Sequence, residues 1–329
     1  MVDQIIKYGG IDNIPLYNCS GRTPEEWSER DGMPRPILGS ITLGYGIIME
    51  LLFIPTLVAM LSKDIIKLSC YKIMFFIFIV DVLALVMNSL VTGYLAIIGA
   101  VYCTHPHLIY IFGMYGFGLW CCSCIANILL LLNRILNLKN PHLSKRIFTG
   151  KRTILLLFIP VIYAVSLITF NPTCVFSSKL YAWFYDPNIF ENRTAEYANL
   201  GHGFNNVMII VVICVMNIYV GIDLMRTSRG ATKKNWKAHS VLYQAILICL
   251  INQISSGVYV FMNFVPIPPW VIVFAHYLWQ LDHSFPMIIC LIMNSTMRKK
   301  FWITLGRNPK KVGASSVDKP SARTAVSDS

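Results

Sequence analysis

The chain has 329 residues, of which 55% are hydrophobic and 13% are charged, and its mean hydropathy is +0.58. Because soluble domains carry about 25% charged residues, this composition excludes an ordinary soluble protein and indicates an integral membrane protein of one domain. The net charge of +12 does not indicate nucleic-acid binding, since basic residues in short loops between apolar segments are typical of the cytoplasmic side of a membrane protein.

Seven apolar segments follow one another along the chain. At about 1.5 Å per helical residue, each can cross the hydrocarbon core of a bilayer, which is about 30 Å thick. The segments are residues 37–61, 73–98, 108–132, 153–173, 204–225, 239–264 and 269–293. The predicted fold is therefore an all-α membrane protein, a seven-transmembrane helix bundle.

The segments divide the chain into three parts. Residues 1–36 form an extracellular N-terminal segment, and residues 37–305 form the seven-transmembrane domain. This domain ends in a short helix over 297–305, whose basic and large apolar residues suit the inner membrane surface. Residues 306–329 are rich in Gly, Ser and Pro, which predicts a disordered cytoplasmic tail.

The distribution of Lys and Arg predicts the orientation. The N-terminal segment and the second, fourth and sixth connections hold 6 of the 28 Lys and Arg residues, and the other connections and the tail hold 22. The positive-inside rule then places the N-terminus outside and the C-terminus in the cytoplasm. The glycosylation motifs at Asn18 and Asn192 both fall on the outer side, where they can accept sugar.

The third segment, continued to Arg134, has the profile of a central helix. Its first part is small and aromatic, and its middle holds cysteines together with Ser123 and Asn127. Small residues let neighbouring helices approach closely, and polar residues face protein rather than lipid. We therefore expect other helices to surround this one.

Three of the ten cysteines, Cys19, Cys103 and Cys174, lie on the predicted outer side, where disulfides form. Three cysteines permit one disulfide and leave one thiol. Cys103, directly before the third segment, is the expected anchor, and from position alone its partner is either Cys19 or Cys174.

Three carboxylates lie deep inside the apolar segments, where each costs at least about 2.5 kcal/mol and needs a partner or a purpose. Measured along their helices, they lie roughly 12 to 18 Å from the inner ends, in one layer with other polar groups. We expect this layer to form a polar cluster joining the first, second, third and seventh helices. The cluster is either a switch core, with hydrogen bonds or a bound cation that change between two states, or a static network that fixes helix register. Its members are Glu50, Asp81, Ser123, Asn127, Asp282 and His283.

A series of short motifs runs along the chain from about residue 16 to residue 300. They include Leu16-Tyr17-Asn18-Cys19-Ser20, Arg35-Pro36-Ile37-Leu38-Gly39, Ser69-Cys70-Tyr71-Lys72-Ile73 with Asp81, Tyr102-Cys103, Leu132-Asn133-Arg134, Trp183-Phe184-Tyr185-Asp186-Pro187, Asn205-Asn206, Trp279-Gln280 with His283 and Pro286, and Asn294-Ser295-Thr296. The order of these motifs is more specific than any single one. Together they resemble the serpentine chemoreceptors of nematodes, specifically class T, a family of seven-transmembrane G-protein-coupled receptors.

The resemblance implies a sensory receptor for small environmental chemicals that signals through a heterotrimeric G protein at the plasma membrane of sensory cells. The family pattern has counterparts of Cys19 and Cys103, which favours a disulfide between these two. Arg134 matches the arginine that ends the third helix of better-known receptors, although Asn133 stands in place of their acidic residue. Arg134 is then either a latch that meets the G protein or a side chain that reaches the lipid headgroups. Arg226, Lys233 and Lys234 suit a G protein or anionic lipid equally well.

For a receptor, the ligand is expected in the outer half of the bundle, where aromatic walls carry few polar groups. The candidate residues are Tyr115, Trp120, Asn205, Tyr259, His276 and Trp279, with Trp270 as either a further lining residue or an interfacial anchor.

Other functions fit the sequence less well. We expect no cofactor, because retinal needs a lysine in the last span, and residues 269–293 contain none. A membrane-embedded zinc hydrolase is the enzyme alternative, since His276 and His283 share one helix face beside Asp282, but no third ligand is evident. A multi-pass transporter is the other alternative, although the sequence shows no internal repeat. We therefore expect a receptor with no catalytic or metal site.

Overall fold

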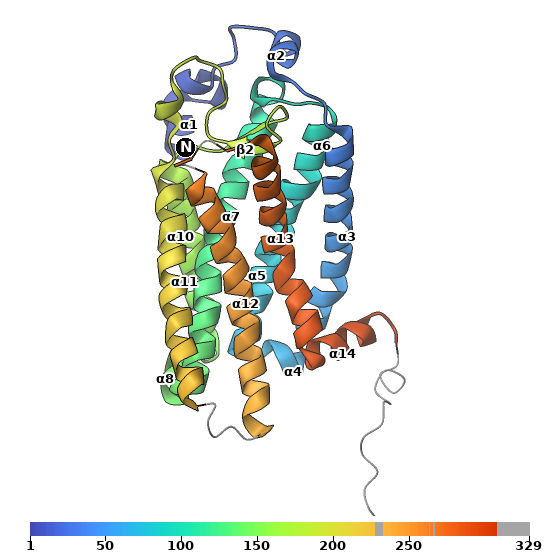
Figure 1. The fold of residues 1–329 in the computed structure, drawn as a ribbon, viewed down its shortest axis with the longest axis vertical. Helices are drawn as coiled ribbons and strands as arrows, with labels where there is room; N and C mark the ends of the chain where they lie inside the picture. The colour runs from blue at the N-terminus through green and yellow to red at the C-terminus, as the bar shows by residue number, and fades with distance from the viewer. Residues whose placement is uncertain (228–232, 263, 266, 308–329) are drawn as a thin grey trace, which may run out of the picture.

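Seven long helical rods stand side by side in the computed structural model and form one bundle (Figure 1). The structure describes residues 1–227, 233–262, 264–265 and 267–307, with the side chains of 223–241 left out of the description. The rods are α3 (Pro36–Met60), α5 (Ser69–Leu85) continued through η3 (Val86–Val91) into α6 (Thr92–Ile97), α7 (Pro106–Lys139), α9 (Lys151–Leu156) with α10 (Phe158–Phe170), α11 (Leu200–Thr227), α12 (Lys233–Phe261) and α13 (Pro269–Met293). The predicted seven-helix membrane fold is confirmed.

Among the described residues, six rods are long and apolar enough to cross a membrane by themselves, and α13 is not among them. Its 25 residues are long enough, but Gln280, Asp282 and His283 lower its hydropathy. All three side chains are buried against other helices. The seventh rod thus turns its polar face into the protein, as polar groups at membrane depth require.

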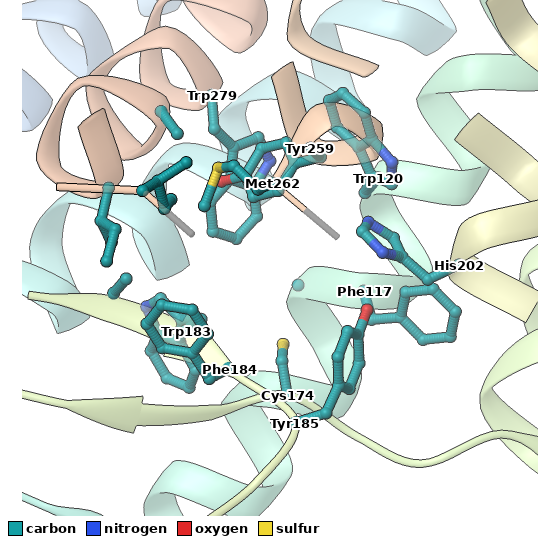
Figure 2. Close-up of a pocket in the computed structure, with 15 residues that line it drawn as sticks. Phe117, Trp120, Cys174, Trp183, Phe184, Tyr185, His202, Tyr259, Met262 and Trp279 are labelled. Atoms are coloured by element: carbon teal, nitrogen blue, oxygen red, sulfur yellow. The ribbon is translucent and has the colours of Figure 1, made fainter. Parts of the chain in front are cut away.

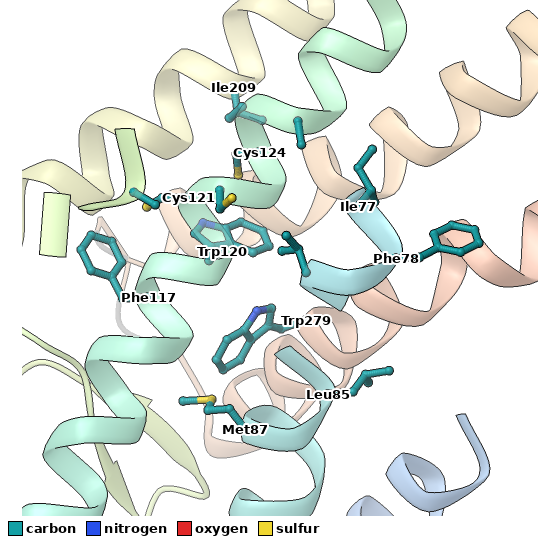
Figure 3. Close-up of a cluster of buried hydrophobic side chains, with 14 of the residues drawn as sticks. Ile77, Phe78, Leu85, Met87, Phe117, Trp120, Cys121, Cys124, Ile209 and Trp279 are labelled. Atoms are coloured by element: carbon teal, nitrogen blue, oxygen red, sulfur yellow. The ribbon is translucent and has the colours of Figure 1, made fainter. Parts of the chain in front are cut away.

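The helix α7 occupies the centre of the bundle, as its sequence predicted. It packs against α5, α10, α11 and α12, and half of its 34 residues are buried (Figure 1). Trp120 and the cysteines of its middle belong to the apolar core between these helices (Figure 3).

The second rod contains one wide, π-helical turn at η3, which leaves the backbone carbonyl of Asn88 available to a partner outside the rod. The amide of Gln280 on α13 donates to this carbonyl at 3.3 Å and to the Ser89 hydroxyl at 2.7 Å. Further along the rod, Gly93 faces Gly39 of α3 so closely that a Cβ on either would lie under 3 Å from the other's carbonyl oxygen. The small pair sets the contact between these rods.

Three prolines lie inside the rods, and Pro160 follows an interruption of its helix. The fourth rod breaks at Leu157, between α9 and α10, where proline cannot donate to the carbonyl four residues earlier. Helices α3 and α13 continue through Pro55 and Pro286.

The N-terminal end of the bundle is covered by a folded cap made of residues 1–35 and the connection 171–199. The first part contains α1 (Val2–Tyr8), η1 (Ile11–Asn13), η2 (Pro15–Tyr17) and α2 (Pro24–Asp31). The second contains η5 (Thr194–Tyr197) and an antiparallel hairpin of β1 (Val175–Ser177) and β2 (Ala182–Phe184), with Phe176 paired to Trp183. Figure 1 shows α1, α2 and β2 together at this end.

Two features join the cap to the rods. The ring of Tyr17 packs edge-on against Tyr102, Tyr110 and Tyr197, so that burial raises the pKa of its hydroxyl well above the usual value. Cys19 and Cys103, which belongs to η4 (Tyr102–Thr104), form a disulfide with their Cα atoms 5.5 Å apart. Of the two pairings that position left open, the structure has the one favoured by the family resemblance.

At the opposite end, short helices cover the rods: α4 (Lys63–Ile66), α8 (Pro141–Phe148) and α14 (Ser295–Thr304). The last corresponds to the helix predicted over 297–305. Asn294 caps it by accepting from the Met297 amide, and Met297 and Phe301 are buried where α14 packs on α3 and α13. In the predicted tail, residues 308–329 lie outside the described residues.

Candidate functional site

A cavity of about 280 Å³ lies directly beneath the cap, between α7, α11, α12, α13 and the hairpin (Figure 2). Its walls are mostly aromatic, with Phe117, Trp120, Trp183, Phe184, Tyr185, Tyr259 and Trp279 among the lining residues, together with Cys174 and His202. None of the described lining residues is Asp, Glu, Lys or Arg. Aromatic walls with few polar groups are typical of sites for small organic molecules.

The hairpin forms one wall of the cavity and is fixed by specific contacts. The indole of Trp183 donates to the Thr92 hydroxyl at 2.9 Å, and its ring packs on Phe176. Before the hairpin, the Cys174 thiol donates to the carbonyl of Gly113 at 3.3 Å. Only glycine fits at position 113, because a Cβ there would lie 1.7 Å from the Cys174 carbonyl oxygen.

Two cap residues in this wall stay uncharged. Burial raises the pKa of the Cys174 thiol to about 12 and that of the Tyr185 hydroxyl well above its usual value. Both therefore present neutral groups to the cavity at physiological pH.

Two tryptophans form the opposite wall and connect the cavity to the interior. The rings of Trp120 and Trp279 both lie against the imidazole of His283, with centroids 6.3 and 6.4 Å away. Figure 3 shows both tryptophans in the buried core between α7 and α13. A molecule in the cavity would thus press on side chains that contact His283 directly.

Below these tryptophans lies a polar core, made of Asp81, Asn252, Asp282 and His283. His283 Nδ1 is 2.9 Å from Asp81 Oδ1, and both side chains are fully buried. The Asn252 amide donates to Asp282 Oδ2 at 3.0 Å, and Asp282 lies near enough to Asp81 for the two carboxylates to interact. Asp81 Oδ2, Asp282 Oδ1, Asn252 Oδ1 and His283 Nε2 have no hydrogen-bond partner among the described residues. A half-satisfied network of this kind can adopt other pairings.

Of the predicted polar cluster, the structure brings Asp81, Asp282 and His283 together, on the second and seventh rods. Glu50 on α3 is half-buried and forms no hydrogen bond or ion pair with any described residue. Its depth matched that of the other carboxylates, but depth along a helix does not give the direction in which a side chain points. The helix α12 joins the core instead, because Asn252 donates to Asp282. Ser123 and Asn127 are buried and pair with each other on α7 at 3.4 Å, without a hydrogen bond to Asp81.

Of the residues predicted to bind a ligand, Trp120, Tyr259 and Trp279 line the cavity and the others do not. Asn205 lies behind the wall, where it accepts from the Tyr163 hydroxyl and donates to Asn206. His276 is buried against Tyr181 and Tyr277, Tyr115 packs on Phe112, and Trp270 is 70% exposed. These four residues were predicted from their depth along a helix, and the side chain of each points away from the cavity.

The sequence reasoning missed the hairpin wall and His202. Residues 183–185 stood out only as part of a family motif, since their apolar character predicts neither a turn nor contact with the rods. His202 lies two residues before the fifth apolar segment and belongs to the first turn of α11. Its signal would have been a histidine one helical turn before Asn206, because residues four apart share a helix face.

At the end away from the cap, Arg134 is half-buried with Nε unpartnered among the described residues, and one of its other nitrogens lies 3.7 Å from the Met74 sulfur. The neighbouring Asn133 is buried and donates to the Ser69 hydroxyl at 3.1 Å. Arg134 thus has no described carboxylate partner. The side chains of Arg226, Lys233 and Lys234 lie outside the described residues.

Two further predictions concern groups outside the cavity. Asn18 and Asn192 both lie in the cap, half-buried and exposed respectively. Within the described part of the chain, no three His, Cys, Asp or Glu side chains are placed to hold a metal ion. Of the pair behind the zinc alternative, His276 lies against Tyr181 and Trp279, and His283 is paired with Asp81.

A seven-helix membrane bundle with an aromatic cavity under a folded cap and a buried polar core beneath it is the architecture of a seven-transmembrane receptor. The comparison with known families agrees: the model of the serpentine type 7TM GPCR chemoreceptor family Srt matches residues 4–314, and the chain belongs to this family. A curated relative, serpentine receptor class T-55 of Caenorhabditis elegans, is 27% identical over 296 residues, covering 88% of this chain and 80% of that protein. The protein is thus a multi-pass membrane protein of the class T chemoreceptor family.

Proposed function

We propose that this protein is a chemosensory receptor that binds a small environmental molecule in the cavity beneath the cap and activates a heterotrimeric G protein at the opposite end. The observation that carries the proposal is the direct contact between the cavity wall and the polar core. Trp120 and Trp279 line the cavity and lie on His283, whose imidazole is paired with Asp81. A ligand that shifts either indole changes the packing around a histidine whose hydrogen-bond network is incomplete.

The proposed sequence of events is a shift between two arrangements of the polar core. The unpartnered oxygens of Asp81 and Asp282 supply the alternative hydrogen bonds, and the affected side chains lie on α5, α12 and α13. A change in pairing there alters how these helices pack toward the end that holds Arg134. A ligand favours one arrangement only if it binds that arrangement more tightly.

We further propose that the capped end lies outside the cell, in the plasma membrane of sensory cells, and that Arg134 faces the cytoplasm. The strong excess of Lys and Arg in the connections at the Arg134 end supports this orientation. The disulfide between Cys19 and Cys103 and the sugar acceptors Asn18 and Asn192 would then all lie on the oxidising, glycosylated side. Arg134, Arg226, Lys233 and Lys234 would face the G protein or the inner leaflet.

The test is expression in a reporter cell that records G-protein activation, with a panel of volatile and water-soluble compounds. The proposal expects at least one compound to raise the signal above that of mock-transfected cells, and expects substitution of Trp120 by Ala to remove the response. A response that survives this substitution would show that the ligand acts at another place. Antibody labelling of intact cells at an N-terminal tag tests the orientation, which is wrong if the tag is labelled only after permeabilisation.

A further inference from the structure

The cavity contains a chain of hydrogen bonds that fixes which nitrogen of His202 carries the proton. The Trp120 indole, which can only donate, donates to Asn206 Oδ1 at 2.9 Å. Asn206 must therefore turn its amide nitrogen to His202, where Nδ2 lies 3.1 Å from Nε2. Because an amide nitrogen only donates, Nε2 accepts, and a neutral His202 carries its proton on Nδ1.

The other nitrogen of this imidazole is thus a donor without a partner. Among the described residues, no hydrogen bond joins His202 Nδ1, while the ring packs between Phe117, Tyr185 and Tyr259. Figure 2 shows the imidazole entering the cavity beside Phe117. A second N–H of the cavity wall, Trp279 Nε1, is buried and also lacks a partner among the described residues. The cavity therefore presents an unpaired donor at His202 Nδ1.

The same cavity is unsuited to ions. Its described lining residues include no Asp, Glu, Lys or Arg. The nearest acid in sequence, Asp186, accepts within its own loop, from the Asn188 amide at 2.8 Å and the Thr194 hydroxyl at 2.6 Å. A charge buried without a partner is strongly unfavourable. A cationic or anionic ligand would meet this cost in the cavity, and a neutral one would not.

We propose that the ligand is a neutral molecule that accepts a hydrogen bond from His202 Nδ1, with a mainly apolar or aromatic body. This assignment rests on the function proposed above and names its ligand class. Size limits it further: a cavity of about 280 Å³ holds roughly nine water-sized groups at about 30 Å³ each. Ketones, aldehydes and esters of small aromatic or aliphatic skeletons meet all of these conditions. His202 sets specificity, and Asn206 positions its proton.

The test uses four probes that share a phenyl ring and differ in charge and hydrogen bonding: acetophenone, the 1-phenylethylammonium ion, benzoate and ethylbenzene. Binding to the purified full-length protein in lipid nanodiscs is followed by quenching of tryptophan fluorescence, because Trp120, Trp183 and Trp279 line the cavity. We expect acetophenone to bind at least about tenfold more tightly than either ion. We expect ethylbenzene to bind roughly two- to tenfold more weakly than acetophenone, for loss of one hydrogen bond. Equal or tighter binding of either ion, or no binding by acetophenone, overturns the assignment.

Variants of the hydrogen-bond chain test its mechanism. His202→Phe keeps the ring contacts and removes the donor, so acetophenone should bind roughly two- to tenfold more weakly while ethylbenzene is unaffected. In Asn206→Asp, the carboxylate accepts from both Trp120 and His202, which moves the imidazole proton to Nε2 and makes Nδ1 an acceptor. The affinity ratio of 1-phenylethanol to acetophenone should then rise. His142→Phe, at an exposed histidine of α8 at the opposite end of the bundle, is the control and should change nothing.

The failure of this assignment can be told from the failure of the proposed function. A receptor that signals in reporter cells to charged compounds and ignores acetophenone overturns the ligand class and leaves the function standing. A protein that binds acetophenone through His202 and never activates a G protein overturns the proposed function and leaves the ligand class standing. Unchanged acetophenone affinity in a folded His202→Phe protein also overturns the assignment.

Discussion

The cap and the polar core of the bundle differ in how their buried polar groups are paired. In the cap, the disulfide between Cys19 and Cys103, the hairpin and most buried polar groups are held by specific partners, such as Tyr197, which donates to the Leu16 carbonyl at 2.6 Å. In the polar core, Asp81 and Asp282 each have one oxygen without a partner. A satisfied network holds one arrangement, whereas an incomplete one can change its pairing. The cap is thus suited to define a site and the core to respond to it.

The largest effect is expected from Asp81→Asn in the polar core. The change preserves shape but replaces one of the two carboxyl oxygens beside His283, 2.9 Å away, with an amide nitrogen that can only donate. The alternative pairings on which the switch depends are then reduced. We expect surface expression within about twofold of the original protein and at least a tenfold loss of G-protein signal, measured in the reporter cell with flow cytometry of an N-terminal tag. Glu50→Gln is the control, because Glu50 lies outside the core. Full signalling by Asp81→Asn would remove the switch assignment.

In the cap, the largest effect is expected from loss of the disulfide. Cys19→Ser with Cys103→Ser opens a link between residues 84 apart in sequence, and such links typically contribute about 2 to 4 kcal/mol by restricting the unfolded chain. We expect a lower midpoint in thermal unfolding of the purified protein. Cys214→Ser, which removes an exposed thiol of α11, serves as control. If the double variant and Cys214→Ser unfolded at the same temperature, the disulfide would not stabilise the folded protein.

A smaller effect is expected from Gly113→Ala, which tests the contact between cap and rods. The added Cβ would lie 1.7 Å from the Cys174 carbonyl oxygen, so the chain before the hairpin must move, at about 1 to 3 kcal/mol. We expect lower thermal stability together with weaker ligand binding, since Cys174 lines the cavity. Gly203→Ala on α11 has no atom within 4 Å of its new Cβ and should be neutral or slightly stabilising. Equal behaviour of the two variants would contradict the close approach.

The smallest effect is expected from Tyr17→Phe. The Tyr17 hydroxyl is buried without a partner among the described residues, and an unsatisfied buried hydroxyl is unfavourable. Its removal should leave the unfolding midpoint unchanged or slightly higher. Tyr197→Phe removes a hydroxyl that does have a partner and should lower stability by about 1 kcal/mol. The reverse order would mean that Tyr17 finds a partner in solution.

The two regions also differ in how far the sequence could predict them. The polar core was largely predictable, because a carboxylate inside an apolar segment is costly and must face protein. Asp81, Asp282 and His283 were found in this way. Glu50 was included in the predicted core and Asn252 was missed. The reason is that the sequence gives a residue's depth in the membrane but not the direction of its side chain. The cavity was harder, since three of the six candidate ligand residues point elsewhere and the hairpin wall carries no periodic signal.

The sequence by itself determined the membrane class, the number of rods, the central place of α7 and the family. These follow from hydropathy, helix length and motif order, which are properties of short stretches of chain. Only the tertiary structure decided which side chains meet: the Trp120, Asn206 and His202 chain, the contact of both tryptophans with His283, and the hairpin over Gly113. The physical reason is that these contacts join residues far apart in sequence. Their geometry depends on the rotation of each rod about its own axis, which packing sets.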